Sequence, residues 1–382
     1  MLATVIESIT TILALCGLGF YLAALWSARD FVRRKRPSPA AFHPTVSILK
    51  PLKGFDHDMY ASFVSHCRQQ YAGAYELLFG VSSMDDPAVT AVEQLQAEFP
   101  NIAIRLIHTP AVLGANGKVG NLAQIVPQAS YDYLIINDSD IKVSPRYLER
   151  VMAPFADAKT GMTTALYRGR SHGTISSRME ALGISTDFAA GVLTARKLEG
   201  GIHFGLGSTL AVSRTALDAI GGLAPLADYL ADDYELGARI AAKGYRVELI
   251  DEVVETTVPA YSFRAFLEHQ LRWARGMRDA RKLGYLGVVF TFGLAWALLN
   301  LVAAGASLSS IALLSLLLAA RVTLALAIGV GVLGDRQVLR DLWLLPLRDV
   351  VALGVWAWSY AGNTVVWRGR RFTLKKGKLK TV

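Results

Sequence analysis

Cysteine is nearly absent from this chain, whose 382 residues include only Cys16 and Cys67. Two cysteines cannot build a disulfide framework or a cysteine-ligated zinc site, and so few are consistent with a reducing compartment. The sequence also has no internal repeats, no long low-complexity segments and no recognisable RNA- or DNA-binding module, so we expect no nucleic acid partner. The net charge of +9 is concentrated beside apolar runs, which indicates an anionic membrane surface.

Apolar residues make up 52% of the chain and are unevenly distributed. Within residues 1–27, the run from 3 to 26 is interrupted only by Glu7 and is long enough to span a bilayer. Five basic residues follow between 29 and 36, which indicates a cytoplasmic end. In a cleavable signal peptide the positive charge precedes the apolar run. We therefore expect an N-terminal transmembrane helix in an integral membrane protein.

The region 284–366 contains further apolar stretches at 284–305, 307–333 and 342–366, and a basic tail follows at 367–382. The charge of the tail predicts a cytoplasmic location. If the preceding domain is also cytoplasmic, an even number of spans must separate the two. The third stretch contains Pro346, Arg348 and Asp349, so the alternative to a span is a re-entrant or interfacial segment. We expect two or three C-terminal membrane segments. Arg321, in the second stretch, either forms a structural ion pair within the protein or contacts lipid headgroups.

Residues 37–261 have mixed polarity and are predicted to form a globular domain. Strand-like runs at 44–54, 75–81, 102–110 and 131–137 alternate with helical patterns and loops. This alternation is typical of an α/β domain with a mostly parallel, Rossmann-like sheet. The loops that follow parallel strands collect at one edge of the sheet, where such folds bind ligands.

Acidic pairs occur in three of the loops of this domain: Asp85 and Asp86, Asp138 and Asp140, and Asp232 and Asp233. Alternate residues of an extended segment point the same way, so Asp138 and Asp140 can hold one hydrated Mg²⁺ or Mn²⁺ with a diphosphate. Alone, an Asx turn explains that pair, and N-capping explains one acid of the last pair. Three such loops together favour a ligand site.

A glycine-rich loop, "GANGKVGNLAQ" at 114–124, carries Lys118, which suits a phosphate group. The loop lacks the Walker spacing, so we do not expect a nucleoside triphosphatase.

Residues 262–283 are predicted to form an amphipathic helix at the membrane interface, between the globular domain and the C-terminal spans. One face is apolar, while His269, Arg272 and Trp273 share another. The helix is either an anchor only, or also part of the site, with Arg272 binding a diphosphate and Trp273 shaping the pocket.

Taken together, these residues resemble the ceramide glucosyltransferase family, membrane-bound inverting glycosyltransferases of GT-A fold that include bacterial hopanoid-glycosylating relatives. The resemblance covers about residues 44–278 in family order. Its motifs are "SILKPLKG" (47–54), "DDPA" (85–88), "NDSD" (137–140), "LADDYELG" (230–237) and "HQLRW" (269–273).

The resemblance implies transfer of glucose or N-acetylglucosamine from a UDP-sugar to a hydroxyl of a membrane lipid, either ceramide or a hopanoid polyol. It assigns uridine to Asp86, a divalent metal to Asp138 and Asp140, and the role of general base to Asp233. Lys118, Arg272 and Trp273 complete the donor site. It also implies a bacterial inner membrane protein whose catalytic domain is cytoplasmic.

One position departs from the family pattern. The residue three places before Arg272 is usually Gln or Arg, but here it is His269. We group His269 with the donor-binding residues, and its role stays open between packing and a phosphate or acceptor contact.

Two alternatives follow from the same residues. A processive polysaccharide synthase shares these motifs, although it usually has more membrane spans and a Gln at position 269. A non-catalytic protein that binds nucleotide-sugars would lack at least one chemical group, whereas all of them are present here.

Overall fold

A seven-stranded mixed sheet forms the centre of the computed structural model, which describes residues 2–34, 42–367 and 369–381. Its strand order is β3-β2-β1-β4-β6-β5-β7. Neighbouring strands run in parallel except β6, which is antiparallel to both β4 and β5. The strands are β1 (Val46–Leu52), β2 (Tyr75–Val81), β3 (Ala103–His108), β4 (Tyr133–Ile136), β5 (Thr160–Ser171), β6 (Leu210–Ser213) and β7 (Arg246–Val258). The predicted α/β class and mostly parallel sheet are confirmed.

Helices cover both faces of this sheet, which explains why β1 is buried along its whole length. Alternate residues of β1 enter separate cores. Ile48 packs in the core beneath α2 (Met59–Cys67), α3 (Ala88–Glu98) and α5 (Tyr147–Met152). Leu49 packs in the core beneath α4 (Gly117–Ile125), α8 (Arg214–Ala219) and α9 (Asp232–Ala242). The loops after the parallel strands β1, β2 and β4 therefore meet at one edge.

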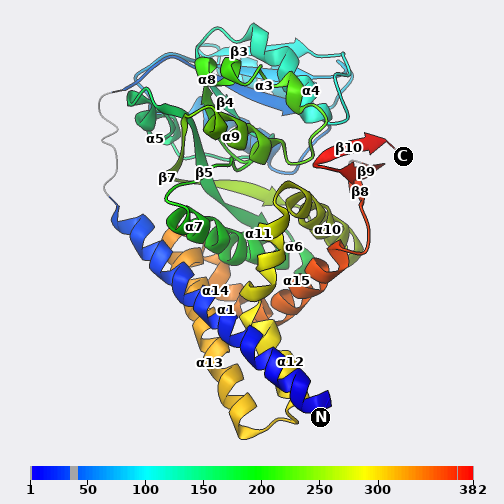
Figure 1. Cartoon of the computed structure of the whole chain (residues 1–382). Helices are drawn as coiled ribbons and strands as arrows, with labels where there is room; N and C mark the ends of the chain where they lie inside the picture. Colours follow the sequence, from blue (N-terminus) through cyan, green and yellow to red (C-terminus); the bar gives the residue numbers. More distant parts are fainter. Residues whose placement is uncertain (1, 35–41, 368, 382) are drawn as a thin grey trace.

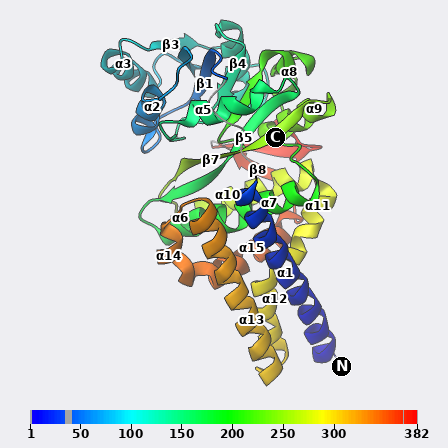
Figure 2. The same cartoon turned by 90° about the vertical axis from the view of Figure 1, so that its left-hand side faces the viewer.

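Three apolar helices lie side by side at the end of the molecule away from this sheet (Figures 1 and 2). They are α1 (Leu2–Arg33), α12 (Gly293–Ala303) and α13 (Leu308–Ala325). Gly17 and Gly293 let α1 and α12 approach closely, because a Cβ on Gly17 would lie 2.2 Å from the Gly293 Cα. Asn300 donates from Nδ2 to the hydroxyls of Thr10 and Thr11 at 3.0 and 2.8 Å.

Among the described residues, two helical segments are long and apolar enough to cross a membrane, Ala3–Arg33 and Leu308–Val332. The pair Lys282–Thr291 and Gly293–Ala303, bent by 54°, makes a third span if it is counted as one. Its first part contains α11 (Lys282–Gly287). The apolar stretch 342–366 contains the shorter α15 (Leu345–Ser359), and in the described chain this stretch has no helix that meets the same test.

Arg321 is fully buried and makes ion pairs with other parts of the chain. Its Nε and Nη2 donate to the two carboxylate oxygens of Asp349, on α15, at 2.9 and 3.1 Å. Its Nη2 also donates to Asp187 at 2.5 Å, in the π-helical turn Ile184–Phe188 of the globular domain. Arg348 pairs with the other oxygen of Asp187 at 3.0 Å. Of the two alternatives for Arg321, the structure shows the ion pair within the protein.

The basic C-terminal segment forms a small antiparallel sheet of β8 (Thr364–Trp367), β9 (Arg370–Lys375) and β10 (Lys378–Thr381). Lys376 and Gly377 both have positive φ, as the two-residue turn of a type I′ hairpin requires. This sheet packs beside the globular domain (Figure 1). The Leu230 amide donates to the Gly377 carbonyl at 3.0 Å, and the Leu379 amide donates to the Asp228 carbonyl at 2.7 Å.

Candidate active site

Lys118 connects two acidic loops at the carboxyl edge of the sheet. Its Nζ lies 2.7 Å from Asp138 Oδ1, after β4, and 3.8 Å from Asp232 Oδ2, at the start of α9. Asn116 caps α4 and donates from Nδ2 to Asp232 at 3.2 Å. Burial by itself would lower the pKa of Lys118, but the charges of Asp138 and Asp232 raise it above its ordinary value. The structure therefore brings Lys118, Asp138 and Asp232 together, with Lys118 held as a cation.

Asp138 and Asp140 have different surroundings although they are two residues apart. The Asp138 side chain is 42% exposed, so a ligand can reach it. Asp140 Oδ2 accepts hydrogen bonds from the Thr256 hydroxyl at 2.6 Å and the Thr257 amide at 2.9 Å, both on β7. Burial and the charge of Asp138 raise the pKa of Asp140 to about 6. Two carboxylates that repel each other in this way fit a divalent cation, which would relieve the repulsion.

Asp233 lies next to Asp232 on α9 and packs against a glycine-rich loop. Its Oδ1 accepts from the Tyr234 amide at 2.8 Å, and its carbonyl accepts from the Gly205 amide at 3.2 Å. A Cβ on Gly207 would lie 3.1 Å from Asp233 Oδ2. Burial and the charge of Asp232 raise the pKa of Asp233 to about 6. Because Gly205 and Gly207 have no side chains, the backbone of this loop can lie close to Asp233.

Asp86 connects two loops of the same edge. Both of its carboxylate oxygens lie 3.0 Å from the Gly54 amide, in the loop after β1, and one accepts from the Ala88 amide at 2.9 Å. These contacts position the start of α3 against the loop after β1. The contact of Asp86 with uridine stays a prediction.

The "HQLRW" residues lie on α10 (Phe263–Ala280), which ends before residue 283 and faces the catalytic domain with this motif. His269 Nδ1 lies 3.0 Å from Oε2 of the buried Glu180, on α6 (Ile175–Gly183). The rings of His269 and Trp273 are 4.9 Å apart, and Trp273 packs against Ala181 and Ile184. In the structure His269 is thus a partner of Glu180.

Two partly buried tyrosines have charged neighbours that include residues of the acidic edge. Burial raises the pKa of Tyr261, and the charges of Glu180, Arg272 and Asp140 also act on it. Burial likewise raises the pKa of Tyr167, on which Asp233, Glu180 and Asp138 act. Arg272 and Asp140 are therefore close enough to share Tyr261 as a neighbour.

Lys50 is a site residue that the sequence analysis did not single out. It is fully buried in β1, and its Nζ donates to the Asp138 carbonyl at 3.1 Å. Burial lowers its pKa to about 7, although Asp140 and Asp138 act in the opposite direction. The available signal was a lysine inside the otherwise apolar strand of "SILKPLKG". Tyr167 and Glu180 carried no comparable signal.

Known proteins support a glycosyltransferase fold and family. Ceramide glucosyltransferases 3 and 1 of Caenorhabditis elegans are 26% and 25% identical over 275 and 255 residues, which is 70% and 66% of this chain. The chain covers only 59% and 54% of these two relatives.

A solved structure, the mannosyltransferase PcManGT from Pyrobaculum calidifontis in complex with GDP-Man and Mn²⁺, shares the fold with a TM-score of 0.57 and 19% identity. The alignment covers 92% of this chain and 98% of that one. The predicted GT-A-type fold is confirmed. The sequence model of Glycosyl transferase family 21 matches residues 9–380. With nearly its whole length matched, this chain belongs to glycosyl transferase family 21 and is related to the ceramide glucosyltransferases.

Proposed function

We propose that this protein is a membrane-bound inverting glycosyltransferase that transfers glucose or N-acetylglucosamine from a UDP-sugar to a hydroxyl of a membrane lipid. The proposal rests on one observation: Asp138, Lys118 and the Asp232–Asp233 pair lie together at one sheet edge in a family 21 chain. Carboxylates for a metal, a cation for a diphosphate and a base are the groups that this transfer needs.

The donor site combines a divalent metal with basic residues. Asp138 and Asp140 would hold Mg²⁺ or Mn²⁺, and the Mn²⁺ in the structure of the mannosyltransferase relative supports a cation of this class. When bound, the metal neutralises charge on the diphosphate. Lys118 and Arg272 add positive charge, Trp273 shapes the pocket beside His269, and Asp86 contacts the uridine.

Asp233 is the proposed general base. With a pKa of about 6, Asp233 is ionised at neutral pH, and its pKa is close enough to 7 for it to accept a proton. The acceptor oxygen forms a bond to the anomeric carbon while the bond from that carbon to the diphosphate breaks. The acceptor proton moves to Asp233, and the charge of the leaving UDP is stabilised by Lys118. A single displacement inverts the carbon, so one carboxylate suffices.

The architecture supports a lipid acceptor in the bilayer. A cleft of about 270 Å³ lies where α10 and α11 meet α15, lined by Arg278, Asp279, Lys282, Leu283, Leu286 and Tyr360. Its mixture of basic and apolar groups suits a lipid near its polar end. The names of the curated relatives favour ceramide, while a hopanoid polyol remains the second acceptor to test.

The test is a donor and acceptor screen on the full chain in nanodiscs. UDP-glucose, UDP-N-acetylglucosamine and UDP-galactose are offered against ceramide and bacteriohopanetetrol with Mg²⁺ or Mn²⁺, with an EDTA control, and lipids are read by mass spectrometry. We expect one metal-dependent sugar per lipid. A polymer would identify a processive synthase instead, and intact nucleotide-sugar binding without any product would identify a non-catalytic binding protein.

A further inference from the structure

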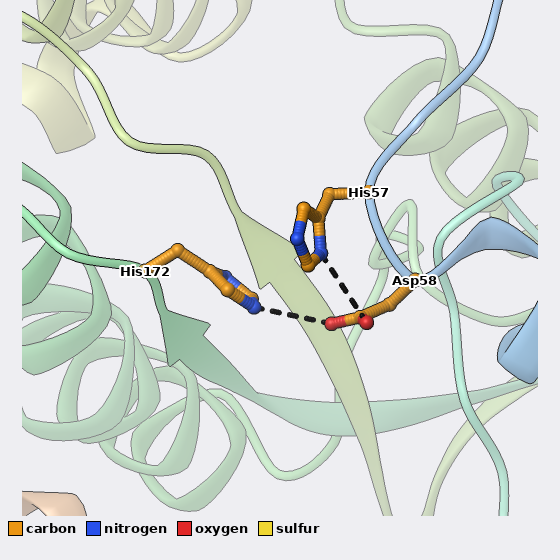
Figure 3. Close-up of side chains that lie close together, drawn as sticks. All are labelled: His57, Asp58 and His172. Atoms are coloured by element: carbon orange, nitrogen blue, oxygen red, sulfur yellow. Dashed lines mark ion pairs between the residues drawn. The ribbon is translucent and has the colours of Figure 1, made fainter.

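A group of three potential metal ligands lies beside the proposed donor site and has no role in it. His57 and Asp58 belong to the loop between β1 and α2, and His172 follows the end of β5 (Figure 3). His57 Nδ1 is 3.2 Å from Asp58 Oδ1, and His172 Nε2 is 3.1 Å from Asp58 Oδ2. One ligand atom from each residue lies within 4.8 Å of the other two.

Asp58 does not perform the usual task of an aspartate at its position. It is the N-cap residue of α2, where the side chain commonly accepts a hydrogen bond from an amide of the first turn, but it makes no such bond. Its φ of 63° lies in the left-handed region that favours glycine. Oδ2 is buried and accepts no hydrogen bond from the described residues. The side chain is turned toward the two imidazoles instead (Figure 3).

The tautomer of His172 directs Nε2 at Asp58 and leaves it available as a metal ligand. His172 Nδ1 lies 3.2 Å from the Val258 carbonyl oxygen, which only accepts, so Nδ1 carries a hydrogen. In the neutral ring, the lone pair is then on Nε2 and faces a carboxylate oxygen at 3.1 Å. Two lone pairs at this distance need a positive charge between them, which either a proton on Nε2 or a metal ion supplies. Histidines that bind metals typically donate their other N–H to a carbonyl or carboxylate in this way.

We propose that His57, Asp58 and His172 form a second divalent cation site, of the Zn²⁺ class, separate from the donor metal at Asp138 and Asp140. Two imidazole nitrogens and one carboxylate oxygen match the ligands of Zn²⁺, whereas Mg²⁺ prefers oxygen alone. Three protein ligands leave a fourth position open. Asp58 and Asp140 line one small cavity of about 40 Å³, so the two sites are neighbours.

The cation would connect the loop after β1 to the end of β5. The same loop donates the Gly54 amide to Asp86 at 3.0 Å, and its Asp56 accepts a hydrogen bond from the Ser139 hydroxyl, between Asp138 and Asp140. A cation at His57 and His172 therefore holds a loop that contacts the proposed uridine and metal residues. Its role is to position the donor site, and it takes no part in the displacement.

Zinc binding by the full chain in detergent tests this site without any need for activity. Protein stripped with EDTA and then dialysed is titrated with Zn²⁺ against a chromophoric chelator, and the bound metal is counted by elemental analysis. We compare the wild type with His57→Gln, His172→Gln, Asp138→Ala and the control His108→Gln, which replaces an exposed imidazole at the end of β3. The His57 side chain is 67% exposed, and its ring packs against the ring of His172 at a centroid distance of 4.5 Å, outside the hydrophobic core.

We expect one tightly bound Zn²⁺ that Asp138→Ala and His108→Gln retain and that both cluster variants bind at least tenfold more weakly. Co²⁺ in place of Zn²⁺ should give visible absorption bands that His57→Gln removes. Two outcomes would overturn the proposal: no Zn²⁺ bound at micromolar concentration, or Zn²⁺ binding that Asp138→Ala abolishes and His57→Gln leaves unchanged. Both readouts are independent of glycosyl transfer, so a failed donor screen does not affect them.

Discussion

At the scale of single residues, the proposed site depends on carboxylates that are partly buried and close together. Asp140 and Asp233 both have a pKa raised to about 6 by burial and neighbouring acids, whereas Asp138 is exposed and paired with Lys118. Their surroundings suit them to different roles. A carboxylate whose pKa is close to neutral pH, such as Asp233, suits a general base, and a pair of carboxylates that repel each other, such as Asp138 and Asp140, suits a bound cation.

Replacing Asp233 by Asn tests the base assignment. The change removes the proton acceptor and keeps the shape of the side chain, so we expect turnover to fall about 10²- to 10⁴-fold. The dissociation constant of the UDP-sugar should change less than about threefold, because the metal ligands remain. Turnover and equilibrium binding are measured on the same preparation. The matched control is Asp132→Asn, which neutralises a side chain that is 85% exposed. Near-normal turnover of Asp233→Asn would show that another group is the base.

The pKa of Asp140 predicts a pH-dependent metal affinity. In the metal-free protein a proton occupies Asp140 below about pH 6, and it must leave before a cation binds. We expect Mn²⁺ affinity to fall about tenfold between pH 7.5 and pH 5, since one pH unit below a pKa leaves about a tenth of the group ionised. Titration calorimetry across this range measures it. Asp140→Asn should bind Mn²⁺ weakly and with a flatter pH profile, and an unchanged profile would exclude Asp140 as a ligand.

The same raised pKa fixes the sign of a stability effect. A carboxylate whose pKa is higher in the folded state binds more protons there than in the unfolded state, between about pH 4 and pH 6. The stabilisation is therefore present at low pH and is lost as the pH rises through about 6. Lys50 gives the free energy of unfolding the opposite pH dependence. Because its pKa is lowered in the folded state, stability rises with pH from about pH 7 upward.

At the scale of elements, the C-terminal sheet supports the loops that carry the site. Its buried residues pack against Ala115 and Leu230. Ala115 directly precedes Asn116, and Leu230 lies two positions before Asp232. Asn116 and Asp232 are joined by a hydrogen bond of 3.2 Å. The basic segment therefore contributes to the proposed donor site through packing, which its charge alone did not indicate.

Phe372→Ala tests this support. Removing a buried aromatic ring costs about 3–5 kcal/mol of local stability, so we expect β9 and β10 to detach from Leu230 and the KM for the UDP-sugar to rise several-fold. Hydrogen exchange of the Leu379 amide reports the detachment, and steady-state kinetics reports the KM. The control is Thr373→Ala, at the exposed neighbouring position. If Leu379 exchanges rapidly while the KM stays constant, the sheet does not support the donor site.

At the scale of the whole molecule, Arg321 couples the apolar helices to the catalytic domain through Asp349 and Asp187. Removing one member of a buried pair leaves an unpaired charge and costs about 3–5 kcal/mol, whereas replacing both by apolar residues costs less. We expect Arg321→Met and Asp349→Leu each to lower the melting temperature in detergent more than the double variant does. A double variant less stable than both single variants would contradict this coupling.

The arrangement of the spans also predicts a topology. If the bent pair 282–303 and the helix 308–332 each cross the bilayer, two spans separate the catalytic domain from the C-terminal sheet, and the parity requirement is met. We expect a C-terminal green fluorescent protein fusion to fluoresce in the cytoplasm and an N-terminal tag to be accessible from the other side. An externally accessible C-terminus would refute this topology, because the C-terminal sheet packs on the catalytic domain.

Local patterns in the sequence were enough to predict the α/β class, the N-terminal apolar helix and the family. The alternation of strand-like runs with helical patterns, the run from 3 to 26 and the five motifs depend on neighbours along the chain, which are visible without a structure. The positions of Asp86 and Asp138 followed in the same way, because the parallel strands β2 and β4 place their loops at one edge.

Only the tertiary structure decided which groups meet. Lys118 pairs with Asp138, while Asp140 turns to Thr256 and Thr257, although the sequence treats the two acids alike. His172 reaches Asp58 across more than a hundred residues, and the basic tail becomes a sheet on the catalytic domain. Such contacts result from the packing of distant segments, which neither residue spacing nor composition encodes.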